Sequence, residues 1–177
     1  MPPIDDQMAE IIKGSISLEI NGKHFYERAA SVTDDKHGKA MFERLAKEED
    51  GHLEVLEGIF ASITDGDDWR EIAERAANRT GRAPIVEQLE KTIAARGKDQ
   101  NANDSNALKI AMEMERKAIR FFEEMLERAE NPKVRELVDA LADEERFHYD
   151  LLQSQLDNLM NVGLWYDSTD VRMDSKF

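Results

Sequence analysis

Apolar residues recur every three to four positions along four long stretches of the chain, which is the pattern of amphipathic helices. In the second stretch, for example, Leu45, Leu56 and Ile59 fall on one helix face. The four stretches span about residues 5–32, 36–63, 103–130 and 132–162. No segment shows the strict apolar–polar alternation of a strand. The sequence therefore predicts an all-α protein.

Turn-forming residues join these stretches in pairs. Thr33-Asp34-Asp35 separates the first two stretches, and Asn131-Pro132 separates the last two. The connection between the pairs is predicted to contain two shorter helices, at about Asp68–Asn78 and Ala83–Arg96. Two tight hairpins joined by a long connection form one of the two standard topologies of a four-helix bundle. We therefore expect a four-helix bundle with a long, partly helical crossover.

The chain is long enough for one domain of ordinary size and too short for two. We expect its 177 residues to form a single domain, with a first hairpin at about 5–63, a crossover at 64–102, a second hairpin at about 103–162 and an irregular tail at 163–177. The cluster Asn103-Asp104-Ser105 is predicted to cap the third long helix. Large apolar residues in the tail predict that it docks onto the bundle, namely Leu164, Trp165, Tyr166 and Phe177.

The two hairpins are an internal repeat. When the sequence is aligned with itself so that Glu19 meets Glu115, Glu49 falls on Glu145 and His52 falls on His148 without a gap. Each hairpin thus carries one glutamate in its first helix, and a second glutamate followed by a histidine three positions later in its second helix. Residues three apart share a helix face, so each Glu-x-x-His pair presents a carboxylate and an imidazole together.

The two glutamates of each hairpin are predicted to lie at the same depth in the bundle. Glu19 and Glu49 are equally far along the chain from position 34 in the first turn, and Glu115 and Glu145 are equally far from position 130 beside the second. In an antiparallel hairpin, equal distances from the turn give equal depth. Four carboxylates and two imidazoles should therefore meet at one level of the bundle.

These carboxylates interrupt the apolar stripes of the helices. A single Glu-x-x-His on an acidic helix is normally part of a solvated face, and we expect Glu48 and Glu144 to lie on such a face. Four unpaired buried carboxylates, however, would cost several kcal/mol each. Two divalent cations would balance their four charges. The repeat therefore predicts a buried two-metal site with the ligands Glu19, Glu49, His52, Glu115, Glu145 and His148.

The absence of cysteine narrows the chemistry of this site. It excludes disulfides, thiolate-bound zinc, iron–sulfur clusters and thiol nucleophiles. Carboxylate and imidazole ligands suit iron or manganese, and zinc fits the same donors. Such a shell tolerates oxidation of both ions, which favours redox chemistry with oxygen or peroxide over a structural role.

Charge excludes two classes of partner. The chain has 24 basic and 38 acidic residues, a formal charge of −14, which repels nucleic acids and anionic membrane surfaces. No apolar run approaches the roughly 18–20 residues of a membrane span. The N-terminal sequence lacks the features of a signal peptide, so we expect a cytoplasmic protein.

The full pattern Glu19 … Glu49-x-x-His52 … Glu115 … Glu145-x-x-His148 resembles the ferritin-like di-iron carboxylate proteins. Within them it is most similar to the rubrerythrins, which is supported by the strings LAKEEDGH at 45–52 and LADEERFH at 141–148. The resemblance covers the two hairpins and says little about the crossover or the tail. It implies a ferritin-like fold and a centre of two iron ions.

The resemblance also implies roles for the ligands. Glu49 and Glu145 would bridge the two metals, with terminal carboxylates from Glu19 and Glu115 and terminal imidazoles from His52 and His148. Tyr26 lies two turns from Glu19 on the same face. It is a candidate to support the ligands, and a plain core tyrosine is the alternative. His24 and His37 lie off the stripe and are expected to be solvated.

Two departures from the rubrerythrin pattern stand out. Typical rubrerythrins carry a rubredoxin domain that supplies electrons, and a chain without cysteine cannot form one. They also have an additional glutamate three residues after the third-helix ligand, where this chain has Ala118. Glu113 lies off the ligand face. The symmetric set of six ligands also resembles the oxidase centre of bacterioferritin.

Three functions remain open at this point. The leading hypothesis is an oxidoreductase that reduces hydrogen peroxide or oxygen while Fe²⁺ is oxidised, with electrons from Fe²⁺ itself or from a separate donor such as a rubredoxin-type protein. The second is a ferritin-type ferroxidase or iron-handling protein. The third is a non-redox metal-binding helical module. A homo-oligomer is expected, with a dimer favoured.

Overall fold

The structure is a computed structural model of the chain and describes residues 6–63, 68–79, 84–96 and 100–168. Within these ranges the chain forms helices and no strand, so the predicted all-α class is confirmed. The helices of the described residues are α1 (Asp6–Val32), α2 (Lys36–Ile63), α3 (Asp68–Arg79), α4 (Pro84–Arg96), α5 (Gln100–Arg128) and α6 (Pro132–Val162).

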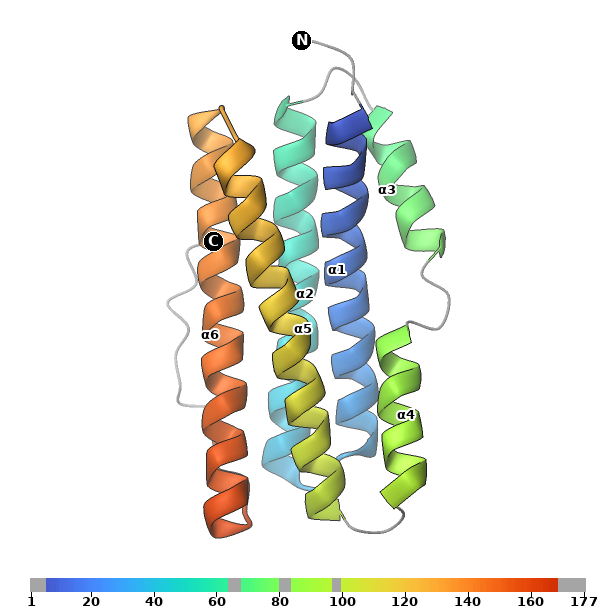
Figure 1. Cartoon of the computed structure of the whole chain (residues 1–177), viewed down its shortest axis with the longest axis vertical. Helices are drawn as coiled ribbons and strands as arrows, with labels where there is room; N and C mark the ends of the chain where they lie inside the picture. Colours follow the sequence, from blue (N-terminus) through green and yellow to red (C-terminus); the bar gives the residue numbers. More distant parts are fainter. Residues whose placement is uncertain (1–5, 64–67, 80–83, 97–99, 169–177) are drawn as a thin grey trace.

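Four long helices form the bundle, and the two short helices lie outside it (Figure 1). Helices α1 and α2 form one antiparallel hairpin, and α5 and α6 form the other. Because α2 and α5 run in the same direction, the chain must return along the whole bundle between them. The 28 residues of α2 span about 42 Å. Helices α3 and α4 follow one another along the outer side of α1 and cover this distance (Figure 1).

Local sequence explains both ends of α6. The side chain of Asn131 caps the N-terminus by accepting a hydrogen bond from the backbone N–H of Lys133 at 2.9 Å. Pro132 occupies the first turn, where its missing N–H costs nothing. Gly163 adopts the left-handed conformation with φ of 74° and donates its N–H to the carbonyl of Leu159 at 2.9 Å. The predicted turn and the predicted helix end are both confirmed.

The start of α5 differs from the prediction. The helix begins at Gln100, so Asn103, Asp104 and Ser105 lie within its first turns instead of capping it. The carboxylate of Asp104 is buried and accepts a hydrogen bond from Trp165 Nε1 at 2.9 Å. Asp104 therefore binds the C-terminal segment, a tertiary contact that local propensity does not contain.

The interior consists of two apolar clusters with a polar layer between them. The Trp69 cluster lies toward the N-terminus of α1, and its larger members are Ile12, Ile16, Leu56, Ile59, Phe60, Trp69, Phe122, Met125, Val138 and Leu141. The Trp165 cluster lies toward the opposite end, and its larger members are Phe25, Tyr26, Met41, Phe42, Leu45, Leu89, Leu108, Leu152, Leu156 and Trp165. Both clusters draw residues from all four long helices, which fixes the helices around the layer.

The C-terminal segment docks onto the bundle as predicted. Trp165 is buried and meets Phe42 edge to face, with ring centroids 5.8 Å apart. The side chain of Gln155 accepts a hydrogen bond from the backbone N–H of Tyr166 and donates one to its carbonyl at 3.0 Å. A Cβ at Gly38 would lie 2.6 Å from the Trp165 ring, so only glycine leaves room for it.

Two of the tail residues that were expected to dock have a different outcome. Leu164 does not dock, since its side chain is 63% exposed while its carbonyl accepts a hydrogen bond from Asn158. Phe177 lies outside the described residues. Within the ranges that the structure describes, no helix is long and apolar enough to span a membrane.

Candidate metal centre

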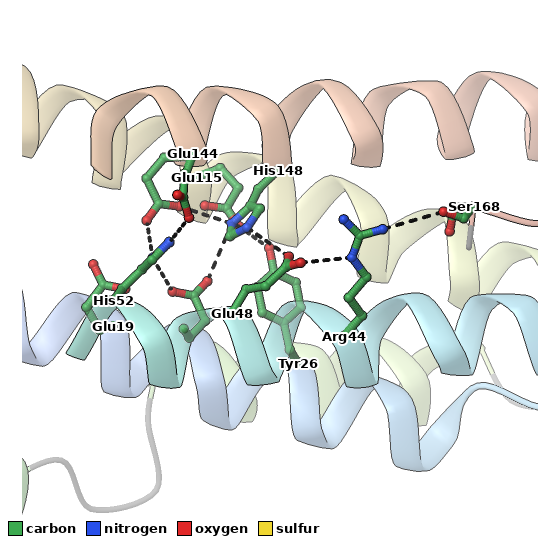
Figure 2. A network of polar contacts seen from close by, with 11 residues as sticks. Glu19, Tyr26, Arg44, Glu48, His52, Glu115, Glu144, His148 and Ser168 are labelled. Atoms are coloured by element: carbon green, nitrogen blue, oxygen red, sulfur yellow. Dashed lines mark hydrogen bonds and ion pairs between the residues drawn. The ribbon is translucent and has the colours of Figure 1, made fainter. Parts of the chain in front are cut away.

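The six predicted ligands meet in the polar layer between the two apolar clusters. Figure 2 shows Glu19, His52, Glu115 and His148 of this layer. Helices α1 and α5 each supply one glutamate, and α2 and α6 each supply a Glu-x-x-His pair. All six side chains are buried, with exposures of 0–3%: Glu19, Glu49, His52, Glu115, Glu145 and His148. The equal depth inferred from the repeat thus agrees with the structure.

The six residues form two overlapping groups, each with ligand atoms within 4.8 Å of one another. The first group contains Glu19, Glu49, His52 and Glu145, and the second contains Glu49, Glu115, Glu145 and His148. Glu49 and Glu145 belong to both groups. The arrangement therefore offers two adjacent metal positions that share two carboxylates.

Each imidazole directs its Nδ1 atom toward the carboxylates. Nδ1 of His52 lies 3.1 Å from Glu19 Oε2 and 3.0 Å from Glu145 Oε1. Nδ1 of His148 lies 3.3 Å from Glu145 Oε2 and 3.8 Å from Glu115 Oε1. The two rings are nearly parallel, with centroids 5.5 Å apart and an interplanar angle of 19°. Glu145 therefore lies between two imidazole donors that the repeat relates to each other.

A glycine in the first hairpin makes room for a shared carboxylate. A Cβ at Gly22 would lie 3.1 Å from Glu49 Oε1, tighter than most side-chain contacts. Gly22 follows Glu19 by three residues, and its partner in the repeat is Ala118, three residues after Glu115. Ala118 is buried in the Trp69 cluster, and the nearby Glu113 is exposed and paired with Arg116 at 2.7 Å. Neither residue adds a carboxylate to the six.

Several buried polar atoms of the layer have no hydrogen-bond partner among the described residues. They are Glu19 Oε1, both carboxylate oxygens of Glu145 and both ring nitrogens of His148. The imidazole nitrogens near Glu145 are close but not aligned for hydrogen bonds. An unsatisfied buried polar group costs about 1–3 kcal/mol. Coordination to cations would satisfy oxygen and nitrogen lone pairs together, so the residues present fit a metal centre.

Electrostatics within the layer lead to the same conclusion. Burial, and next the charge of Glu145, raise the pKa of Glu49 and of Glu115 well above the usual range. Burial alone would raise the pKa of Glu145 too, but the charges of His52 and His148 outweigh it and hold that pKa well below the usual range. Burial lowers the imidazole pKa values, and the carboxylates, Glu145 foremost, raise them further than burial lowers them. Without metal, protons must therefore compensate the carboxylate charges.

Tyr26 contacts the ligand set directly. Its hydroxyl donates a hydrogen bond to Oε1 of Glu115 on the neighbouring helix α5 (Figure 2). Burial, followed by the charge of Glu115, raises the pKa of Tyr26 well above its usual value, so the phenol stays protonated. Its ring also stacks on Phe42, with centroids 6.1 Å apart. The sequence placed Tyr26 near Glu19, whereas the hydrogen bond goes to Glu115.

The expected solvated positions of Glu48 and Glu144 are wrong. Glu144 Oε2 lies 2.9 Å from His52 Nε2, and Glu48 Oε2 lies 3.2 Å from His148 Nε2. Their side chains are only 12% and 22% exposed. Each glutamate thus faces the histidine of the other hairpin, because the helices α2 and α6 pack face to face. The signal was present in the sequence, since Glu48 and Glu144 align in the repeat.

The remaining histidines lie away from the layer, as expected. His24 is exposed. His37 is partly exposed, and its Nδ1 lies 3.7 Å from a carboxylate oxygen of Asp167 in the C-terminal segment.

Comparison with protein families identifies the bundle. The family model named Rubrerythrin matches residues 10–156, which include all six residues of the layer. The chain belongs to the rubrerythrin family. Comparisons with curated proteins and with solved structures gave no significant match. Membership of the rubrerythrin family and the buried carboxylate–histidine cluster together fit a di-iron site.

Proposed function

We propose that this protein is a di-iron oxidoreductase that oxidises Fe²⁺ and reduces hydrogen peroxide or oxygen at the buried layer. The observation that carries the proposal is the pair of four-residue groups sharing Glu49 and Glu145. Two ions held by common carboxylates can each give one electron to the same oxidant. A single-ion site would not need the second group.

Burial restricts the substrate. All six residues of the layer are at most 3% exposed, and apolar clusters cover both sides along the bundle axis. A molecule as small as hydrogen peroxide or dioxygen can reach such a layer through side-chain motion, whereas an organic substrate would require the helices to separate. This favours a small oxidant over an organic substrate.

The chain supplies the metal ligands and their orientation. Glu49 and Glu145 would hold both ions, with Glu19 and His52 at one position and Glu115 and His148 at the other. When bound, two Fe²⁺ ions supply two electrons, which with two protons convert one hydrogen peroxide molecule to two water molecules.

Tyr26 is the residue that we propose to act beside the ligands. Its O–H fixes Oε1 of Glu115. The other oxygen of Glu115 would then be available to a metal. Because its pKa is raised, it holds its proton at neutral pH and keeps this orientation. A hydroxyl at this position keeps a polar hydrogen next to the place where the oxidant is reduced.

Electrons for repeated turnover must come from outside the bundle. The chain contains no cysteine and hence no rubredoxin centre of its own. We propose a separate donor of the rubredoxin type, or Fe²⁺ itself, and a cytoplasmic homodimer as the working form.

A ferritin-type ferroxidase is the second candidate function. The observation that favours it is Ala118, which leaves six ligands in two matching halves without an additional carboxylate. In a ferroxidase, oxygen is the oxidant and ferric iron is the product that leaves the layer.

Rapid mixing separates these functions. Metal-free protein is loaded without oxygen with two Fe²⁺ per chain and mixed with either hydrogen peroxide or oxygen, while near-ultraviolet absorption of ferric iron is recorded. A peroxidase reacts much faster with peroxide, and a ferroxidase reacts fast with oxygen and then releases or stores iron. Tight zinc binding with no ferric signal from either oxidant would contradict both and leave a non-redox module.

A further inference from the structure

The two halves of the layer have matched ligands but unmatched neighbours. The alignment that places Glu19 on Glu115 also places Arg44 on Ala140 and Tyr26 on Phe122. In both pairs the first hairpin has the polar residue and the second has an apolar one. Both polar residues act on the half that contains His148.

The first difference concerns the glutamates behind the imidazoles. Arg44 Nε donates a hydrogen bond to Glu48 Oε1 at 2.8 Å, and Arg44 Nη1 donates one to the carbonyl of Ser168 at 3.5 Å (Figure 2). Glu48 therefore divides its charge between Arg44 and His148. Its contact with His148 Nε2 is 3.2 Å and is not aligned as a hydrogen bond.

The corresponding glutamate in the other half serves one imidazole. Glu144 Oε2 makes an aligned hydrogen bond of 2.9 Å with His52 Nε2. Its other oxygen, Oε1, has no hydrogen-bond partner in the part of the chain that the structure describes. Ala140, at the position that matches Arg44, offers no cation. The carboxylate behind His52 is thus not shared with an arginine at the position that matches Arg44.

The second difference concerns the terminal carboxylates. Glu115 Oε1 accepts a hydrogen bond from the hydroxyl of Tyr26. This hydrogen bond uses a lone pair that a cation could otherwise bind. Phe122 has no hydroxyl to offer Glu19, and Glu19 Oε1 has no hydrogen-bond partner among the described residues. The half with His52 is therefore richer in uncompensated negative charge.

Both differences act in the same direction on metal affinity. A carboxylate that accepts a hydrogen bond from a metal-bound imidazole raises the basicity of that ligand. We infer that the two metal positions are unequal, and that the position of Glu19 and His52 binds its ion first and more tightly than the position of Glu115 and His148. This inference rests on the proposed two-metal centre. It assigns Glu48 and Glu144 as positioning residues, of which Glu144 acts more strongly on its imidazole.

Zinc titration followed by NMR tests the order of filling without any catalytic turnover. The full chain carries ¹⁵N-labelled histidine, and the four histidines are assigned in the metal-free state with His24→Gln, His37→Gln and His52→Gln variants. The first equivalent of Zn²⁺ should move the Nδ1 signal of His52, and the second should move that of His148. Equal progress of both signals, or His148 first, overturns the inference but leaves the metal centre intact. No response of either ring overturns the metal centre and the inference with it.

Mirrored variants provide the second test. Mutual repulsion of two cations gives two binding steps even at identical positions, so the number of steps decides nothing. At identical positions, however, Glu48→Gln and Glu144→Gln would change the zinc isotherm equally. We expect Glu144→Gln to weaken the first step about 10- to 100-fold, and Glu48→Gln to spare the first step and weaken the second.

Tyr26→Phe makes the two halves more alike, because the matching residue is already Phe122. It should strengthen the second zinc step and bring the two constants closer together. Glu54→Gln, an exposed change on α2, serves as the control and should leave both steps unchanged. Indistinguishable isotherms for Glu48→Gln and Glu144→Gln, or a weakened first step in Glu48→Gln alone, would contradict the inference.

Discussion

The two apolar clusters are filled by side chains that stabilise each other, whereas the layer between them holds four carboxylates and two imidazoles at 0–3% exposure. The same four helices build both regions. In the clusters, burial of apolar surface favours folding without any ligand. In the layer, burial of charge opposes folding until cations or protons compensate it. The comparison indicates that the clusters specify the bundle and that the layer is retained for binding.

Glu49→Gln should give the largest effect and affect only the layer. It removes a carboxylate that both four-residue groups share, so binding of two metal ions should be lost. Burial, followed by the charge of Glu145, raises the pKa of Glu49 well above its usual range, so a charge at this position is unfavourable in the metal-free protein and glutamine removes it. We therefore expect metal-free stability within about 1 kcal/mol of wild type or above it. Elemental analysis and urea unfolding measure the two quantities.

The exposed Glu54 provides the control for this charge change, on the same helix. Glu54→Gln should leave metal content and stability unchanged. Retention of two ions by Glu49→Gln would show that the shared carboxylate is not a ligand.

Leu108→Ala should have the opposite profile. Leu108 is fully buried in the Trp165 cluster, two helical turns from Glu115. Its truncation should lower the free energy of unfolding by about 2–5 kcal/mol, because it leaves a cavity. The folded fraction should still bind two ions. Loss of metal in protein that is folded by circular dichroism would mean that the clusters and the layer are not separable.

The metal-free protein should become more stable as the pH falls from about 7.5 to 5.5. Glu49, Glu115, His52 and His148 all have folded-state pKa values above those of the unfolded chain, so the folded state binds more protons in this window. Stability then decreases as pH rises. Glu145 has a lowered pKa, so it makes the folded state less stable as the pH falls, but only below the pKa of about 4.3 of an unfolded glutamate. Thermal unfolding at several pH values measures this slope.

The metal-loaded protein provides the matched comparison. Its ligands must be deprotonated, so protons compete with metal. The stability of the metal-loaded protein should therefore increase as the pH rises. Equal slopes with and without metal would show that the layer does not control the pH dependence.

Gly38→Ala should give a smaller effect, confined to the Trp165 cluster. The new methyl group would overlap the ring of Trp165, which must shift, at a cost of about 1–3 kcal/mol. Gly51→Ala on the same helix meets nothing within 4 Å and should stabilise the protein by up to about 1 kcal/mol. Tryptophan fluorescence and thermal unfolding distinguish the two variants. An unchanged Trp165 environment in Gly38→Ala would contradict the docking of the tail.

The sequence was sufficient to predict the bundle and the meeting of the six residues. The helical period gave the four long helices, and the repeat placed Glu19, Glu49, Glu115 and Glu145 at one depth because antiparallel hairpins preserve distance from the turn. These features depend on spacing alone.

Features that depend on contacts between distant parts of the chain do not follow from the spacing within one helix. Glu48 was assigned to solvent because it lies about 100° around the helix from Glu49, but that direction faces His148 of the other hairpin. Asp104 was assigned to a helix cap because Asn, Asp and Ser favour that position. Nothing in the local sequence indicates its hydrogen bond with the indole N–H of Trp165. In both cases the partner belongs to a different element, far away along the chain.

Metal stoichiometry is the most direct test of the two-metal layer. Metal-free protein is incubated with excess Fe²⁺ without oxygen and then freed of unbound metal. Iron is measured by inductively coupled plasma mass spectrometry and protein by amino-acid analysis. The account predicts two iron ions per chain in wild type and fewer than one in Glu49→Gln. One ion or none in wild-type protein, or two in both proteins, would contradict it.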